Sequence, residues 1–193
     1  AYTDRYRIFI ADATGHGIQA ALSTMLIKSE YEKSKSYNFL AADTLELFNN
    51  EYYEKYANLH SYFTCFILDI DLMNNEITFS SGGHPEQILI SKNEIHFLTT
   101  KGAVIGAFPE RKYNHKTVSI ASGDKILLFS DGLAETLNEE DEFLGTDRLY
   151  EIIENHKENT IKDMISLIMS DIWDFQGKGN AHDDVTLVGI EIK

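Results

Sequence analysis

The chain is poor in cysteine and has no long apolar run. Its single cysteine, Cys65, cannot form an internal disulfide, so a reducing, cytoplasmic setting fits best. No apolar stretch approaches the ~20 residues that cross a bilayer, and nothing at the start reads as a signal peptide. We therefore expect no membrane insertion of this domain.

Basic residues are also few. The chain has 17 Lys and Arg against 31 Asp and Glu, which gives a net charge of −14. A field of this sign repels nucleic acid, and no cluster of Lys and Arg offsets it, so nucleic acid is excluded as the main partner. The acidic balance is compatible with cation binding but does not demonstrate it.

Several common catalytic motifs are absent. The glycine-containing segment 102–106 lacks the Gly-Lys-Ser/Thr ending of a P-loop. There is no Gly-x-Ser-x-Gly elbow and no pair of metal-binding cysteines, which removes the usual serine-hydrolase and zinc-site interpretations.

What the sequence does contain is the composition of an ordinary globular domain, with 43% hydrophobic and 25% charged residues. No repeat or Pro/Gly-rich linker divides it, so we expect one domain over 1–193. Apolar periodicity predicts helices over about 18–33, 39–56, 146–156 and 160–175, and strands over 6–11, 61–70, 76–80, 87–90, 95–98, 116–120, 125–129 and 185–192. This order predicts an α+β fold in which helices cover both faces of packed antiparallel sheets.

Aspartates stand beside three of the predicted strands. Asp12 follows the first strand, Asp131 follows the strand 125–129, and Asp183 with Asp184 precedes the last one. Carboxylates at such positions can ligate a hard cation. Each also has a simpler explanation: Asp12 could cap a helix, Asp131 with Gly132 could form a turn, and the third pair could lie in a solvated loop.

Two histidines and an acidic run are weaker candidates. His84 lies in a Ser-Gly-Gly-His-Pro turn, and His16 comes four residues after Asp12. A lone histidine is more often structural than catalytic. The acidic run 139–142 is interpreted as a solvated loop.

Five segments, in order along the chain, resemble motifs of the SpoIIE/RsbU-type bacterial phosphatases of the PPM superfamily. The segment around Asp12 reads Phe-Ile-Ala-Asp-Ala-Thr-Gly-His-Gly, and the one around Asp131 reads Leu-Leu-Phe-Ser-Asp-Gly-Leu-Ala-Glu. The others are the Gly-His-Pro turn at His84, the glycine loop 102–106 and the His-Asp-Asp-Val-Thr segment that begins at residue 182.

The resemblance implies a four-layer α-β-β-α sandwich that holds two divalent cations, Mn²⁺ or Mg²⁺. By family analogy Asp12 bridges both cations and the carbonyl oxygen of Ala13 completes one coordination shell. Asp131 and Asp183 then bind the other cation, and Asp184 is a further candidate ligand.

The implied reaction is hydrolysis of phosphoserine or phosphothreonine by a water that the cations activate, without a phosphoenzyme. Asp12 and His16 are the catalytic candidates. Thr14 stands where better-known eukaryotic relatives have a histidine suggested to be the general acid, so the role of His16 stays open. His84 and Glu135 are candidates for substrate binding.

The resemblance further implies a signalling partner. The expected substrate is a phosphorylated regulator of STAS fold, such as an anti-sigma-factor antagonist, in bacterial signal transduction. An upstream sensor domain in the same chain is expected, and a homodimer is compatible with the family. Members usually have strands before the first motif, so the chain is expected to be an N-terminally truncated fragment of a larger regulator. The alternative is a phosphatase-fold module that binds a partner without hydrolysis, or an inactive fragment.

Overall fold

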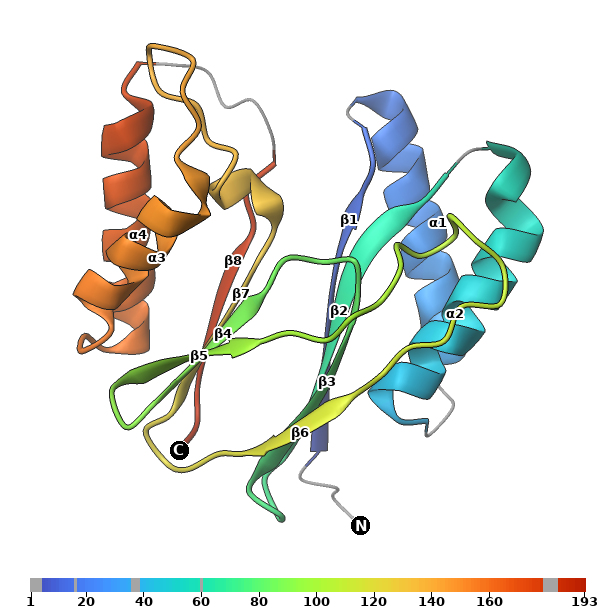
Figure 1. The fold of residues 1–193 in the computed structure, drawn as a ribbon, viewed down its shortest axis with the longest axis horizontal. Helices are drawn as coiled ribbons and strands as arrows, with labels where there is room; N and C mark the ends of the chain where they lie inside the picture. Colours follow the sequence, from blue (N-terminus) through green and yellow to red (C-terminus); the bar gives the residue numbers. More distant parts are fainter. Residues whose placement is uncertain (1–4, 16, 36–38, 60, 179–183) are drawn as a thin grey trace. The chain divides into compact units, whose positions relative to one another are not determined.

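The computed structural model describes residues 5–15, 17–35, 39–59, 61–178 and 184–193. Over these residues the protein is α+β, with two antiparallel four-stranded sheets and four α-helices (Figure 1). The chain divides into two compact units, Ala1–His84 with Thr99–Ile120, and Pro85–Leu98 with Ala121–Lys193. The predicted α+β class is confirmed, and each unit is described below by itself.

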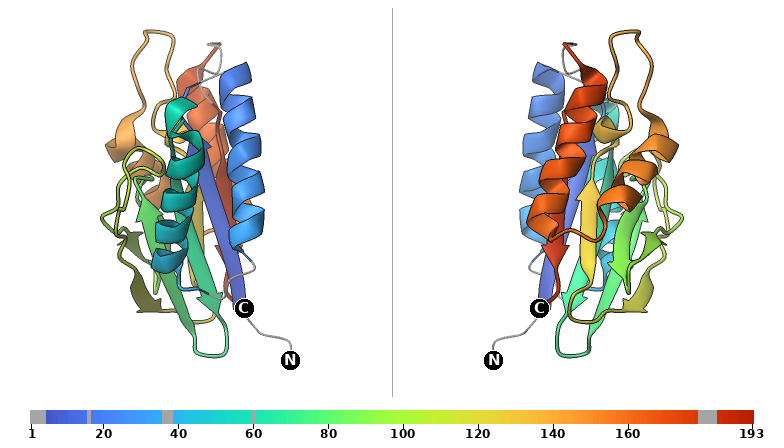
Figure 2. Two further views of the ribbon diagram at one scale, coloured as in Figure 1. Left: turned by 90° about the vertical axis from the view of Figure 1, so that its right-hand side faces the viewer. Right: turned by 90° about the vertical axis from the view of Figure 1, so that its left-hand side faces the viewer.

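The first unit contains one sheet with α1 (Ile18–Ser34) and α2 (Ala41–Tyr56) side by side along one face (Figure 2). A short 3₁₀ turn, η1 (Ala57–Leu59), follows α2. The sheet has the order β1-β2-β3-β6. Its strands are β1 (Arg5–Ala13), β2 (Phe63–Asp71), β3 (Glu76–Gly82) and β6 (Lys116–Ser119).

Strand alternation builds the core of this unit. Phe63 and Cys65 of β2 are fully buried on the helix side of the sheet, in one cluster with Phe48 and Tyr52 of α2. The ring centroids of Phe48 and Phe63 lie 5.3 Å apart. Burial strongly raises the pKa of the Cys65 thiol, so this residue stays protonated and packs as a small hydrophobe.

Helix α1 packs through a face that its apolar spacing does not reveal. The apolar side chains Ile18, Leu22 and Met25, which predict the helix, are 83%, 58% and 69% exposed. The buried positions are Ser23, Ile27, Glu30 and Ser34. The helix prediction is therefore confirmed, but three of the four buried residues are polar, and the apolar Leu26 and Tyr31 beside them are only partly buried.

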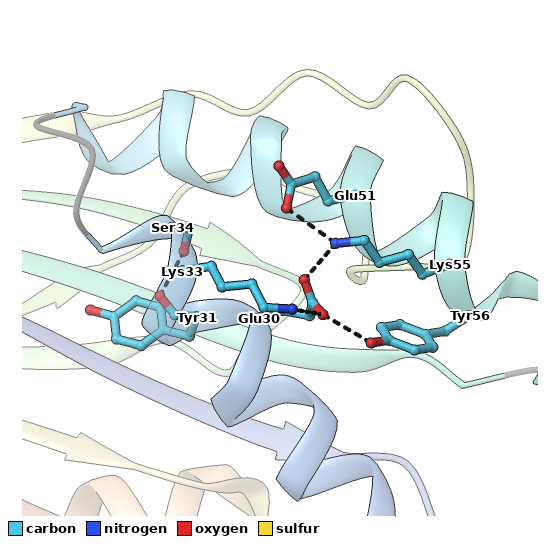
Figure 3. Close-up of polar contacts among 7 residues, drawn as sticks. All are labelled: Glu30, Tyr31, Lys33, Ser34, Glu51, Lys55 and Tyr56. Atoms are coloured by element: carbon cyan, nitrogen blue, oxygen red, sulfur yellow. Dashed lines mark hydrogen bonds and ion pairs between the residues drawn. The ribbon is translucent and has the colours of Figure 1, made fainter.

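The carboxylate of Glu30 is the centre of that contact (Figure 3). Glu30 is only 2% exposed, and its Oε1 accepts hydrogen bonds from Lys33 Nζ at 2.8 Å and from the Tyr56 hydroxyl at 2.9 Å. Its Oε2 accepts a hydrogen bond from Lys55 Nζ at 2.7 Å. Lys55 and Tyr56 belong to α2, so the cluster joins the two helices.

Replacing Glu30 by glutamine should lower the free energy of unfolding by about 2 kcal/mol, because it removes the charge from a buried, hydrogen-bonded ion cluster. Glu51→Gln is the matched control, since Glu51 also contacts Lys55, at 3.5 Å, but is more exposed. It should cost less than about 0.5 kcal/mol. Urea denaturation of both variants measures the difference, and equal losses would contradict a special role for Glu30.

The same cluster makes stability depend on pH. Burial alone would raise the pKa of Glu30, but hydrogen bonds from Lys33, Lys55 and Tyr56 outweigh it and lower the pKa from 4.5 to about 2. The contribution is therefore complete above pH 4.5 and is lost as the pH falls towards 2. The stability difference between wild type and Glu30→Gln should shrink across that window.

The second unit contains a sheet of order β5-β4-β7-β8. Its strands are β4 (Gln87–Ser91), β5 (Glu94–Leu98), β7 (Lys125–Phe129) and β8 (Leu187–Glu191). A 3₁₀ turn, η2 (Asp131–Leu133), follows β7, and the helices α3 (Gly145–His156) and α4 (Ile161–Gln176) lie along one face (Figure 2).

Helix α4, predicted over 160–175, packs through a stripe of apolar residues spaced four apart. Met164, Ile168 and Ile172 are buried in one cluster with residues of β4 and β7. Gly189 of β8 permits the close approach, because a Cβ there would lie 2.6 Å from Ile165 Cδ1. Among the helices that the structure describes, none combines the length and the apolar character that a membrane span requires.

Candidate functional site

Asp12 lies inside β1 and not after it, which corrects the predicted strand end. The strand continues to Ala13, and Asp12 pairs with Thr64 of β2 while Ala13 pairs with Phe63. Directly opposite residues of an antiparallel pair share a face of the sheet. Phe63 and Cys65 pack towards the helices. Asp12 and Thr64 therefore share the sheet face that does not carry α1 and α2.

His84, which lies just after the end of β3, contacts Thr64. The Thr64 Oγ1 and His84 Nδ1 atoms lie 2.8 Å apart and share a hydrogen bond. The His84 backbone N–H donates to Ser81 Oγ at 3.1 Å, and the residue is only 8% exposed. The histidine is thus buried, whereas the sequence places it at the tip of a tight turn. Sequence reasoning missed Thr64, which has no motif around it.

The glycine loop at 102–106 is a structural connection. A Cβ on Gly102 would lie 2.0 Å from the Ser81 carbonyl oxygen, so only glycine fits there. Ile105 exchanges backbone hydrogen bonds with Phe63 in both directions, and the Gly106 N–H donates to Asn49 Oδ1 of α2 at 2.9 Å. The loop therefore ties β2 to α2.

In the second unit, Asp131 is held by the end of strand β7. Gln87 is fully buried, and its side-chain amide donates to the Phe129 carbonyl at 3.1 Å and accepts from the Phe129 N–H at 2.7 Å. This pair of bonds continues the β4–β7 ladder beyond the pairing of Ile88 with Leu127. Gln87 thereby fixes the backbone two residues before Asp131, a contact that no local sequence signal indicates.

The segments around Asp131 and Asp184 are joined directly. Ser130 Oγ donates to the Asp184 carbonyl at 3.3 Å and accepts from the Thr186 N–H at 3.1 Å. A Cβ on Gly132 would lie 2.4 Å from the Asp184 carbonyl oxygen, so the close approach requires glycine. Two of the predicted acidic segments are therefore neighbours in space. Two further candidates, Asp183 and His16, lie outside the described residues.

The Asp131 carboxylate has an unsatisfied atom. Its Oδ1 is buried and has no hydrogen-bond partner among the residues that the structure describes. Burying a carboxylate oxygen without a partner is costly, and a hard cation would offset that cost. Over the described ranges, no group of three or more His, Cys, Asp or Glu residues is gathered around one point. The unsatisfied oxygen and the adjacent Asp184 segment would fit a cation site if further ligands were supplied from elsewhere.

A pocket of about 560 Å³ opens beside Asp131, within the second unit. Asp131 and Glu135 both line it, so a predicted metal ligand and a predicted substrate-binding residue share one cavity. Its apolar lining consists of Pro85, Phe129, Ala134, Phe143, Leu149 and Tyr150.

The acidic run 139–142 is exposed, as predicted, but it belongs to a hydrogen-bonded hairpin. The Leu144 N–H donates to the Thr136 carbonyl at 2.8 Å, and Leu137 forms a β-bridge with Phe143. The side chain of Asn138 closes the turn, because its Oδ1 accepts from the N–H groups of residues 140 and 142 at 3.0 and 2.8 Å. This hairpin carries Phe143 to the pocket.

Comparison with known proteins identifies relatives of this chain. The chain is 29% identical over 191 residues to the phosphoserine phosphatase RsbU of Bacillus subtilis (strain 168), covering 96% of this chain and 55% of RsbU. The chain spans about half the length of the curated relatives it matches.

Solved structures show the same fold. The SiaA-PP2C domain of Pseudomonas aeruginosa superposes with a TM-score of 0.88 at 20% identity, covering 100% of this chain and 78% of that domain. The catalytic domain of the serine/threonine phosphatase PstP, in complex with two manganese ions, superposes with a TM-score of 0.65 at 13% identity, covering 100% and 93%.

The family model described as Stage II sporulation protein E (SpoIIE) matches residues 2–193. This match spans both compact units and all five of the motif segments. The chain therefore belongs to the SpoIIE family, the PP2C-type serine phosphatase domains of the PPM superfamily.

Proposed function

We propose that the chain is a metal-dependent protein phosphatase that hydrolyses phosphoserine on a small regulatory protein in bacterial signalling. The observation that carries this proposal is the buried, unsatisfied Oδ1 of Asp131, in a segment joined to Asp184 through Ser130. Membership of the SpoIIE family and the similarity to a phosphoserine phosphatase support the reaction class.

The residues proposed to hold two divalent cations are Asp12, the Ala13 carbonyl, Asp131, Asp183 and Asp184. Bound cations would lower the pKa of a water and neutralise charge on the phosphoryl oxygens. The similarity in fold to a phosphatase domain that binds two manganese ions supports this choice of cofactor. All of these donors are oxygen atoms, which Mn²⁺ and Mg²⁺ accept.

The chain's own residues orient these ligands. Gln87 holds the Phe129 backbone, Ser130 ties its own segment to residues 184 and 186, and Gly132 leaves room for the Asp184 carbonyl. Such supporting contacts fix where a carboxylate points before a ligand arrives. In the first unit, pairing of Asp12 with Thr64 within a continuous strand performs the same task. His16 remains the proposed additional catalytic residue.

The proposed substrate is a phosphoserine-bearing protein of STAS type. The similarity to RsbU, a phosphoserine phosphatase, supports phosphoserine as the substrate group. The net charge of −14 disfavours a strongly anionic partner, so we expect recognition to use a protein surface and not the phosphate alone.

Phosphate release from a phosphorylated STAS-type protein tests this function. In Mn²⁺ we expect turnover with a higher kcat/KM than for para-nitrophenyl phosphate, and EDTA should abolish it. Turnover that persists in EDTA would contradict metal dependence. Binding of the phosphoprotein without phosphate release would instead identify a non-catalytic interaction module.

A further inference from the structure

The pocket beside Asp131 combines an apolar wall with an acidic rim. Leu149 is fully buried, whereas Phe143 on the hairpin is 63% exposed. The ring of Tyr150 packs against Phe97 with centroids 4.8 Å apart, which supports one side of the pocket. An exposed aromatic ring at the edge of an apolar cavity is typical of a site that receives a large apolar side chain.

The charge of the rim restricts what can enter. Glu86 and Glu135 line the pocket beside Asp131, whose charge a bound cation would offset, and no Lys, Arg or His is among the lining residues that the structure describes. Burial and the nearby carboxylates of Glu86 and Asp147 raise the pKa of Tyr150, so its hydroxyl stays neutral. An acidic segment would be repelled here, and a segment with Lys or Arg would be attracted.

We propose that this pocket binds a large apolar side chain of the phosphoprotein, close to the phosphoserine, from a segment that also carries a basic residue facing Glu86. The inference rests on the proposed function, which places the phosphoserine beside Asp131. Asp131 itself lines the pocket, so the apolar side chain would lie within a few residues of the phosphoserine. Binding energy gained there would position the phosphoryl group for attack.

The test uses fluorescein-labelled, alanine-based peptides in which a difluoromethylene phosphonate replaces the phosphoserine phosphate, so that binding is measured without turnover. Leucine is placed in turn at each position near the phosphonate, and fluorescence anisotropy in Mn²⁺ gives Kd. We expect one position at which leucine binds at least about tenfold more tightly than alanine. Lysine beside it should bind more tightly than glutamate.

Phe143→Ala should bring the ratio of the alanine-peptide Kd to the leucine-peptide Kd towards one, because it removes the exposed ring of the pocket. Trp173→Ala is the matched control, since Trp173 is 61% exposed in the same unit but does not line the pocket. Glu86→Gln should reduce only the preference for lysine over glutamate. A leucine preference that survives Phe143→Ala, or that is absent at every position in the wild type, would overturn the proposal.

Phosphate release from the corresponding phosphoserine peptides separates this proposal from the proposed function. A leucine preference in binding without phosphate release supports the pocket and contradicts the phosphatase. Release without any leucine preference in Kd supports the phosphatase and overturns the pocket. Failure of every peptide to bind at millimolar concentration also overturns the pocket.

Discussion

Asp131→Asn is expected to lower kcat/KM for a phosphoserine substrate at least about a hundredfold, because even the outer partners of metal ligands contribute about 10- to 100-fold. Asparagine keeps the shape of the side chain but removes the charge that balances a cation. The rise in melting temperature that Mn²⁺ produces should also be lost, since only a ligand bound to the folded state stabilises it.

Asp141→Asn is the matched control for this substitution. Asp141 is exposed in the hairpin turn of the same unit, with a left-handed backbone that asparagine also adopts. It should leave both the activity and the response to Mn²⁺ unchanged. An Asp131→Asn variant that still melts at a higher temperature in Mn²⁺, as the wild type does, would contradict the assignment of this ligand.

Gly132→Ala should lower both the stability of the protein and its affinity for Mn²⁺, although it changes no charged group. Gly132 does not have a left-handed backbone, so alanine is compatible with its conformation. The cost is steric, because the new Cβ would lie 2.4 Å from the Asp184 carbonyl oxygen. We expect a loss of about 2 kcal/mol in stability and a weaker Mn²⁺ affinity as the two segments separate.

Ser130→Ala tests the same junction without adding bulk. It removes the hydroxyl that links residues 184 and 186, and should cost about 1 kcal/mol. Thermal melts with and without Mn²⁺ compare the two variants. A Gly132→Ala variant with wild-type Mn²⁺ affinity would show that the close approach does not shape the metal site.

Most of the fold can be predicted from the sequence because its strands and helices carry regular apolar periods. The strand 125–129 agrees with β7 at both ends. The predicted end of β1, at residue 11, was wrong. Aspartate is rare inside strands, so the prediction stopped before Asp12, but pairing with Thr64 holds Asp12 in the ladder.

The buried face of α1 could not be predicted, because a charged residue occupies it. Lys33 in the same helix supplies one hydrogen bond to the buried Glu30, but the other two come from Lys55 and Tyr56, 25 and 26 residues further along the chain. Local periodicity contains no information about such partners, so the exposed apolar stripe of α1 dominates the sequence signal.

Some residues of the candidate site can likewise be predicted from the sequence, and others cannot. Asp12 and Asp131 can be picked out as candidates from the sequence because each stands in a motif, Asp12 near the end of β1 and Asp131 just after β7. Gln87 cannot, because its role depends on hydrogen bonds between its side chain and the backbone of Phe129, 42 residues away. The structural use of the loop 102–106 likewise follows only from its contacts with Ser81 and Asn49.

The central claim is that aspartates of this chain hold two divalent cations for phosphoserine hydrolysis. Equilibrium dialysis against Mn²⁺ tests it most directly by counting the bound ions per chain. We predict two for the wild type, and fewer for both Asp12→Ala and Asp131→Asn. No bound Mn²⁺ at millimolar concentration, or two ions retained in both variants, would contradict the account.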